Sequence, residues 1–337
     1  MNPSEIETCD RDFCLVCNSK GELLYKKLKD QLFSVSGEWN LSVCPKCRLV
    51  WLNPYPQPQE LDKIYKTYYT HQKRSVNFLD PLSQYLEKHV FAALGYRDIL
   101  KRKYIGIGNI PILREYIGLG ILKINSSWGN RLLDVGSGNG EFLYKMKKLG
   151  WNAEGVETDL KAAEFTKKQY DLVVYHGTLS QVALPADYYD VVTLSHVIEH
   201  VFDPEEVLME CKRILKPGGR IILITPNTQS LSHRIFKRNW RGFEVPRHIA
   251  IFSVDNMRLL VKKVGFKSDT LTSTARVSRY LYSTSVHMKQ GRFAIGAGGN
   301  RGYLLALISY GFQVIEEISL FFNSNLGEEI YFVGRKV

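Results

Sequence analysis

The sequence of 337 residues has no run of 18 consecutive apolar residues, so it predicts no membrane-spanning helix. Its first residues, MNPSEIETCD, lack the basic and then apolar pattern of a signal peptide, so secretion is not expected. Cysteine is scarce, and four of the six cysteines stand in two C-x-x-C pairs. This spacing favours metal ligation in a reducing compartment over disulfides. The sequence therefore predicts a cytoplasmic protein.

Acidic residues are the minority among the charges, and the formal net charge is +11. Apolar residues make up 45% and charged residues 23% of the chain, which is typical of a globular protein and excludes a disordered one. The basic residues are dispersed, so the excess has two interpretations. It either serves general solubility, or it attracts an anionic partner: nucleic acid, a nucleotide-linked substrate or an acidic membrane surface.

The two C-x-x-C pairs predict a zinc ribbon in residues 1–70. A spacer of 26 residues separates the pairs and can hold a β-hairpin. Four thiolates complete a tetrahedral site with no open position, which indicates a structural and not a catalytic metal. A catalytic dithiol is the alternative. The predicted ligands are Cys14, Cys17, Cys44 and Cys47.

A glycine turn between two predicted strands is the centre of the remaining chain. Arg131–Val135 forms a short apolar run, and three glycines follow at every second position. Residues 141–149 have helical spacing, and a second strand ends on Glu157. This order is typical of half of a nucleotide-binding α/β sheet, because glycines let the backbone approach a ligand closely.

The turn reads D-x-G-x-G-x-G from Asp134, and Glu141 stands where a dinucleotide fingerprint needs its third glycine. It resembles the turn of the class I S-adenosylmethionine-dependent methyltransferases. The resemblance implies that Asp134 lies near the amino group of the donor and that Glu157 holds its ribose. It also implies that Leu179 and its neighbours border the adenine. The full predicted donor site is Asp134, Gly136, Ser137, Gly138, Gly140, Glu157, Thr158, Thr178, Leu179 and Ser195.

A second stretch, residues 190–227, resembles the same family in the right order after the glycine turn. The resemblance implies an α/β fold with a Rossmann-like seven-stranded methyltransferase sheet in residues 129–337. Residues 276–327 would be an insertion before the last strand. The residue pattern of 71–128 predicts a helical connector, which either packs over the ligand edge of the sheet or serves as a substrate lid or a membrane-surface segment.

Three histidines are candidates for a catalytic base. His196, Glu199 and His200 form H-x-x-E-H after the fourth predicted strand, a spacing that either binds a metal or forms local hydrogen bonds. Residues 228–252 resemble the substrate loop of bacterial sugar methyltransferases that carry an N-terminal four-cysteine zinc domain. The resemblance implies His248 as base, with His200, His196 or no protein base as alternatives. The substrate candidates of this loop are Trp240, Arg241, Glu244 and Arg247.

Residues 303–322 are apolar apart from a narrow polar stripe. A helix of this kind packs in a core, in a homodimer or in a membrane interface. The last option would place the enzyme at the inner membrane surface, near a lipid-linked acceptor.

Together these features predict a methyltransferase with S-adenosylmethionine as donor and a structural Zn²⁺. The expected acceptor is a small molecule or a nucleotide-linked sugar of surface-polysaccharide or natural-product biosynthesis, with O-methylation preferred over C-methylation. An RNA base methyltransferase is disfavoured, because Asn-Pro-Pro-Tyr and a cysteine nucleophile are both missing after the fourth strand. A non-catalytic donor-binding protein is the other alternative.

Overall fold

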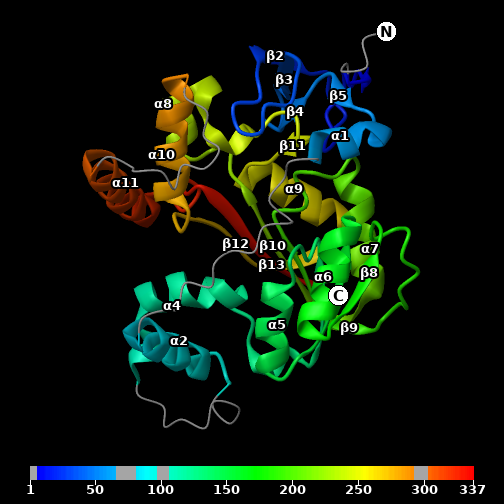
Figure 1. The fold of residues 1–337 in the computed structure, drawn as a ribbon, viewed down its shortest axis with the longest axis vertical. Coiled ribbons are helices and arrows are strands. Elements are labelled where there is room, and N and C mark those ends of the chain that lie inside the picture. The colour runs from blue at the N-terminus through cyan, green and yellow to red at the C-terminus, as the bar shows by residue number, and fades with distance from the viewer. Residues whose placement is uncertain (1–5, 66–80, 97–105, 292–302) are drawn as a thin grey trace. The chain divides into compact units, whose positions relative to one another are not determined.

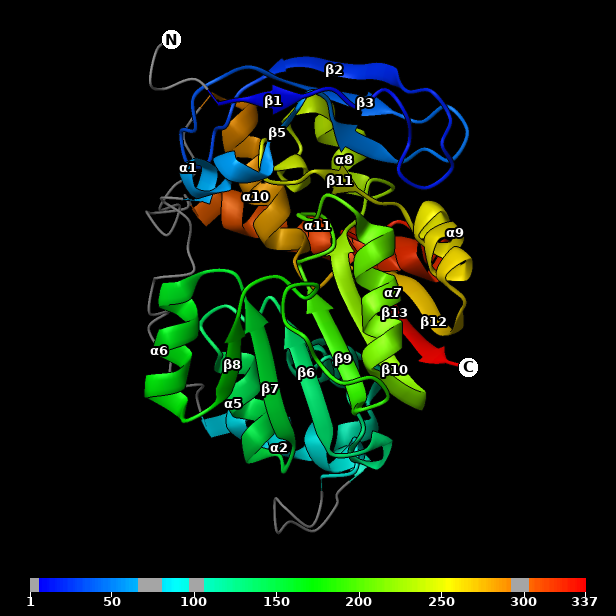
Figure 2. The same ribbon diagram turned by 90° about the vertical axis from the view of Figure 1, so that its right-hand side faces the viewer.

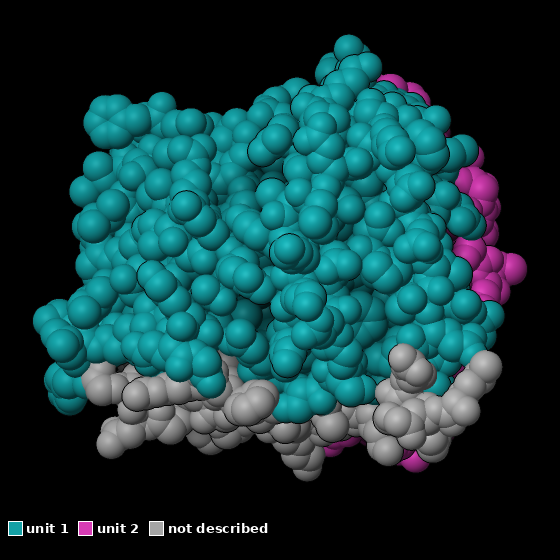
Figure 3. Space-filling model, turned by 90° about the horizontal axis from the view of Figure 1, so that it is seen from above, with its two compact units in different colours: residues 1–68, 195–209, 223–334 teal, residues 69–194, 210–222, 335–337 magenta. Residues whose placement is uncertain are grey.

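The computed structural model describes residues 6–65, 81–96, 106–291 and 303–337. The chain divides into two compact units, which Figure 3 colours separately. The first unit comprises residues 1–68, 195–209 and 223–334, and the second comprises residues 69–194, 210–222 and 335–337.

A seven-stranded sheet has the order β12-β13-β10-β9-β6-β7-β8. The neighbours β6, β7, β8 and β9 pair in parallel, and Figure 2 shows β13 running opposite to β10. This arrangement confirms the predicted Rossmann-like sheet. The strands are β6 (Arg131–Val135), β7 (Asn152–Glu157), β8 (Val173–His176), β9 (Tyr189–Ser195), β10 (Leu215–Pro226), β12 (Phe266–Thr274) and β13 (Glu329–Lys336).

The central strands β6 and β9 are mainly apolar, as expected where both faces of a sheet are covered. Leu132, Leu133, Val191 and Val192 are fully buried. On the helices α5 (Glu141–Lys148) and α6 (Leu160–Tyr170), the inward positions are apolar or small, and the lysines point outward. Asp159 begins α6 by accepting hydrogen bonds from the N–H groups of residues 161 and 162.

The connector contains the helices α2 (Pro81–Ala93) and α4 (Pro111–Gly118), drawn in Figure 1. Glu87 on α2 forms an ion pair with Lys145 on α5. The Trp151 indole, just before β7, donates to the Tyr96 hydroxyl at 2.9 Å. These described contacts lie on α5 and at the amino end of β7. The described part of the connector therefore makes these contacts away from the ligand edge of the sheet, where the connector was predicted to pack.

A second sheet in the first unit has the antiparallel order β11-β4-β3-β2. Its hairpin β2–β3 lies between the two cysteine pairs, as the spacer predicted. The pairing of β4 with the distant β11 was not predicted. The strands are β2 (Glu22–Leu28), β3 (Trp39–Val43), β4 (Val50–Leu52) and β11 (Ala250–Ile251), and β1 (Thr8–Cys9) pairs with β5 (Tyr55–Pro56).

Local capping explains where the next helices begin. Asp203 accepts hydrogen bonds from the N–H groups of residues 205 and 206, and Ser253 and Asn256 form a reciprocal capping box. The remaining helices are α1 (Leu61–Tyr65), α7 (Pro204–Ile214), α8 (Leu231–Phe236), α9 (Val254–Val264), α10 (Ser278–Lys289) and α11 (Tyr303–Phe322).

The strand β10 begins at Leu215, although Lys216-Pro-Gly-Gly219 is a sequence typical of a turn. Lys216 forms an ion pair with Asp190 at the start of β9, which holds the segment alongside that strand. The predicted insertion contains α10 and α11.

We predict that Gly140→Ala lowers the free energy of unfolding by at least about 2 kcal/mol. A Cβ there would lie 2.2 Å from the Thr166 side chain, in addition to the cost of a φ of +74°. Gly218 is the matched control, since its φ is +76° but a Cβ meets nothing within 4 Å. Gly218→Ala should cost only about 1 kcal/mol in urea unfolding. Equal shifts of the two variants would contradict this packing.

Candidate functional site

The glycine turn lies in the second unit, between β6 and α5. Gly136, Gly138 and Gly140 have φ values of +71°, +52° and +74°, a region that other residues enter only at a cost. A Cβ at Gly138 would meet nothing within 4 Å. The middle of the turn therefore leaves space against its backbone, where a ligand can approach.

Glu157 ends β7 and is tied to the turn. Its buried carboxylate accepts a hydrogen bond of 2.7 Å from the Gly138 N–H and one of 2.9 Å from the Asp159 N–H. Thr158, the next residue, is exposed, and its hydroxyl lies 3.4 Å from the same carboxylate. Glu157, the last residue of β7, thus holds the loop that follows β6.

Asp134 is buried on β6, and its carboxylate accepts a 2.6 Å hydrogen bond from the Thr193 hydroxyl on β9. Burial and the nearby Glu157 charge raise the pKa of Asp134 to about 7, although the Thr193 hydrogen bond opposes this shift. A cationic group placed beside the two carboxylates would favour their ionised forms.

The other predicted donor residues differ in their surroundings. The Ser137 hydroxyl is buried against β7, where a Cβ on Gly155 would lie 2.7 Å from it, so Ser137 faces the sheet. Leu179 is buried, while Thr178 is exposed and its N–H donates to the Gln181 side chain. Ser195 ends β9 and is half-buried. Their roles toward a donor stay predictions.

A buried cluster in the first unit, here called the histidine cluster, consists of Glu199, His200, Glu244 and His248. The two imidazole rings are 4.7 Å apart at 76°. His248 Nδ1 donates to the carbonyl of Gly242 at 2.7 Å, which leaves Nε2 with its lone pair in the neutral ring. His200 Nδ1 lies 2.9 Å from the Tyr65 hydroxyl.

The surroundings of this cluster shift the pKa values of His248 and Glu199. Desolvation and the neighbouring His200 lower the pKa of His248 to about 4, so its imidazole is neutral at pH 7. Glu199 is fully buried, yet the nearby histidines lower its pKa to about 2, against the effect of desolvation. The cluster therefore combines an ionised carboxylate with a neutral imidazole.

His196 differs from His248 in its partners and in the direction of its pKa shift. Its Nδ1 and Nε2 lie 3.3 Å from Glu199 and 2.8 Å from Glu329, and these carboxylates raise its pKa to about 10 although desolvation lowers it. The H-x-x-E-H residues do not form one ligand group among the described residues. Instead Glu199, His200 and His248 bring one ligand atom each within 4.8 Å of one another, a set that could hold a metal ion.

The loop residues predicted to bind substrate are buried. Arg247 forms a bidentate ion pair with Asp30, with both N–O distances at 2.9 Å, and its Nε lies 3.1 Å from Glu244. Arg241 also pairs with Glu244. The Trp240 indole N–H donates to the Glu328 carboxylate at 3.1 Å. These contacts shape the loop, and direct binding of substrate by these side chains stays a prediction.

Four partners of this site were not predicted: Asp30, Tyr65, Glu328 and Glu329. Glu329 is the first residue of β13 and Glu328 directly precedes it, and both are fully or almost fully buried. Burial raises the pKa of Glu328 to about 7, although the hydrogen bonds that its carboxylate accepts oppose this shift. A pair of acids at the start of a strand is the one signal that could have found them.

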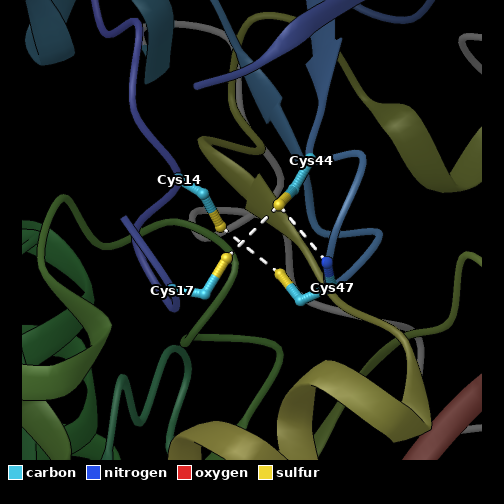
Figure 4. A group of neighbouring side chains, drawn as sticks. All are labelled: Cys14, Cys17, Cys44 and Cys47. Carbon is cyan, nitrogen blue, oxygen red and sulfur yellow. Dashed lines mark hydrogen bonds between the residues drawn. The ribbon is translucent and has the colours of Figure 1, made fainter. Parts of the chain in front are cut away.

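The four predicted zinc ligands converge in the first unit (Figure 4). Cys14 Sγ lies 3.4 Å from Cys47 Sγ, and Cys17 Sγ lies 3.4 Å from Cys44 Sγ. Tetrahedral zinc with Zn–S bonds near 2.3 Å requires sulfur separations of about 3.8 Å. The thiols therefore fit zinc after a small adjustment, and four protein ligands leave no position for a substrate.

The fold and the glycine turn define a methyltransferase domain. Residues 113–271 match a family model described as a methyltransferase domain. The chain therefore carries this domain, as the resemblance of its motifs implied.

Two curated relatives are named ubiquinone biosynthesis O-methyltransferase. The protein of Actinobacillus pleuropneumoniae is 31% identical over 127 residues, which cover 35% of this chain and 53% of the relative. The protein of Cereibacter sphaeroides is 34% identical over 148 residues, which cover 41% and 60%. The chain thus spans little more than half the length of these relatives.

A crystal structure of an S-adenosylmethionine-dependent methyltransferase from Thermotoga maritima has 21% identity and a TM-score of 0.42. The similarity covers 62% of this chain and 83% of that one.

We predict that the purified protein holds one zinc ion and that Cys44→Ser abolishes its retention. The serine hydroxyl is a poor substitute for a thiolate ligand. Elemental analysis by mass spectrometry measures the metal. Cys211→Ser, at a buried thiol outside the group, is the control and should retain full zinc. A metal-free wild type, or zinc retained by Cys44→Ser, would contradict the site.

Proposed function

We propose that this protein is an S-adenosylmethionine-dependent methyltransferase that methylates a hydroxyl of a small-molecule acceptor. The observation that carries the proposal is the glycine turn, with its open backbone at Gly138 and with Asp134 and Glu157 at the carboxyl ends of adjacent strands. Ligands of such sheets bind beyond the carboxyl ends of the strands.

The residues of this turn suit the chemistry of that donor. S-adenosylmethionine brings a sulfonium that makes its methyl group an electrophile, and an ammonium at its methionine end. In our proposal Asp134 faces the ammonium, which would favour the ionised form of a carboxyl whose pKa is raised to about 7. In the same proposal the Glu157 carboxylate accepts hydrogen bonds from the ribose hydroxyls. It has lone pairs left for them, since it accepts only two hydrogen bonds from backbone N–H groups.

We assign the general base to His248. The hydroxyl proton of the acceptor passes to Nε2 of the neutral imidazole as the methyl carbon leaves sulfur and bonds to the acceptor oxygen. Gly242 holds the tautomer by accepting from Nδ1, and Glu244, 3.7 Å from Nε2, stabilises the imidazolium. His196 suits this role less, because both its nitrogens face carboxylates. His200 is the alternative base.

The acceptor class is part of the proposal. The resemblance of the substrate loop supports a sugar or nucleotide-linked sugar. The names of the curated relatives support O-methylation over C-methylation. In the loop, the Asp30–Arg247–Glu244 network fixes the backbone that presents His248.

We predict that Glu157→Ala weakens S-adenosylmethionine binding by about 10- to 100-fold, the loss expected for hydrogen bonds to a charged acceptor. Isothermal titration calorimetry measures it. Glu164→Ala on α6 is the control, because Glu164 is exposed and should bind the donor like wild type. Wild-type affinity of Glu157→Ala would show that the ribose assignment is wrong.

We predict that His248→Ala lowers kcat by about 10²- to 10⁴-fold, the contribution typical of a general base, while donor affinity is retained. His287→Ala on α10, outside the histidine cluster, should keep the wild-type rate. If His248→Ala turns over a found acceptor at the wild-type rate, His248 is not the base.

The pH profile provides a second test of the same base. Because the pKa of His248 is lowered to about 4, its neutral form persists well below pH 7. The wild-type kcat at pH 5.5 should stay within about twofold of its value at pH 7.5. A base with the ordinary histidine pKa near 6.5 would retain only about a tenth. Such a tenfold loss would assign the role to another group.

A further inference from the structure

Helix α11 presents an apolar face that nothing in the described chain covers. Its outward side chains include Leu304, Leu307, Val314, Ile318, Phe321 and Phe322, with Leu304 70% and Phe321 95% exposed. The helix contains no lysine or arginine, and of its two acids Glu316 is fully buried and Glu317 is half-buried. Exposed apolar surface of this extent marks a binding surface for a protein or a membrane.

The opposite face of α11 is anchored to the first unit. Phe312 stacks on Tyr282 of α10 with ring centres 4.4 Å apart, and the Gln313 amide donates to the carbonyl of Ala275. The polar residues Ser309 and Glu316 lie on this buried side. Because the inner face packs on protein, the outer face of α11 is the one that the described residues leave uncovered.

This packing decides between two membrane geometries. By length and composition α11 could cross a membrane. This differs from the expectation of no membrane-spanning helix, which was based on the lack of an unbroken apolar run. A crossing helix would have to detach from α10 and expose the buried Glu316 carboxyl to lipid. A helix lying in the membrane surface keeps its inner contacts and buries only its outer face.

Charge at the edge of this face favours a lipid surface as its occupant. The Arg279 guanidinium lies 4.1 Å from the centre of the Tyr310 ring, at the edge of the apolar face. Anionic lipid headgroups attract this guanidinium, and they also attract a chain whose net charge is +11. A two-fold dimer would use the same patch on both copies and bring two Arg279 guanidinium groups to one interface.

We propose that α11 lies in the surface of an anionic lipid membrane, with its axis parallel to the bilayer and its outer face among the acyl chains. The aromatic residues Tyr303, Phe321 and Phe322 stand at its two ends. The helix spans about 30 Å, enough to fix the orientation of the first unit on the surface. This inference does not depend on the proposed methyl transfer.

The test uses the zinc-loaded full chain with vesicles of phosphatidylcholine containing about 30% phosphatidylglycerol, a fraction typical of an anionic leaflet. Wild type should cosediment with these vesicles and bind pure phosphatidylcholine more weakly. The triple variant Leu304→Glu, Leu307→Glu, Ile318→Glu should lose at least about tenfold in affinity. The matched control carries the same charges at exposed apolar positions elsewhere: Leu23→Glu, Met209→Glu and Leu259→Glu.

A second variant reports insertion without disturbing the face. Phe321→Trp should shift its fluorescence to the blue on addition of the anionic vesicles. Zinc content and urea unfolding confirm that each variant is folded. Absence of wild-type binding, or equal affinity of the two triple variants, overturns the proposal. A wild type that dimerises through α11 by light scattering and ignores vesicles overturns it in favour of a second copy.

Discussion

The hydrogen bond from the Gly138 N–H to the Glu157 carboxylate is the constraint on which the candidate donor site depends. It joins the loop after β6 to the end of β7, and it exists because Gly138 adopts a φ that other residues avoid. The same carboxylate also holds the N–H of Asp159, the residue that caps α6. One buried acid thus fixes two loops at the ligand edge and keeps lone pairs for a hydroxyl-bearing ligand.

In the first unit, buried ion pairs hold the loop that carries His248. The buried ion pairs among Asp30, Glu244 and Arg247 tie the loop before β11 to the four-cysteine segment. Buried ion pairs add little net stability, because desolvation offsets their attraction, but breaking one leaves a buried charge uncompensated. The network therefore specifies one loop conformation. The four-cysteine segment thus supports that loop through Asp30.

Features encoded within a few residues were predicted well. The strand Arg131–Val135, the three glycines and the convergence of four cysteines follow from local spacing, and the structure confirms them. Pairings over long distances were missed. Asp30 and Arg247 are 217 positions apart, and the two-residue β11 has no periodicity to detect. The orientation of His196 depends on its left-handed backbone and on Glu329, neither of which has a local signal.

Calorimetric titration of the zinc-loaded wild-type protein with S-adenosylmethionine, and with its demethylated product, tests the central claim most directly. The account predicts saturable binding of both compounds with one site per chain. A folded, zinc-loaded protein that releases no heat with either compound, and is not stabilised by them against unfolding, would contradict it.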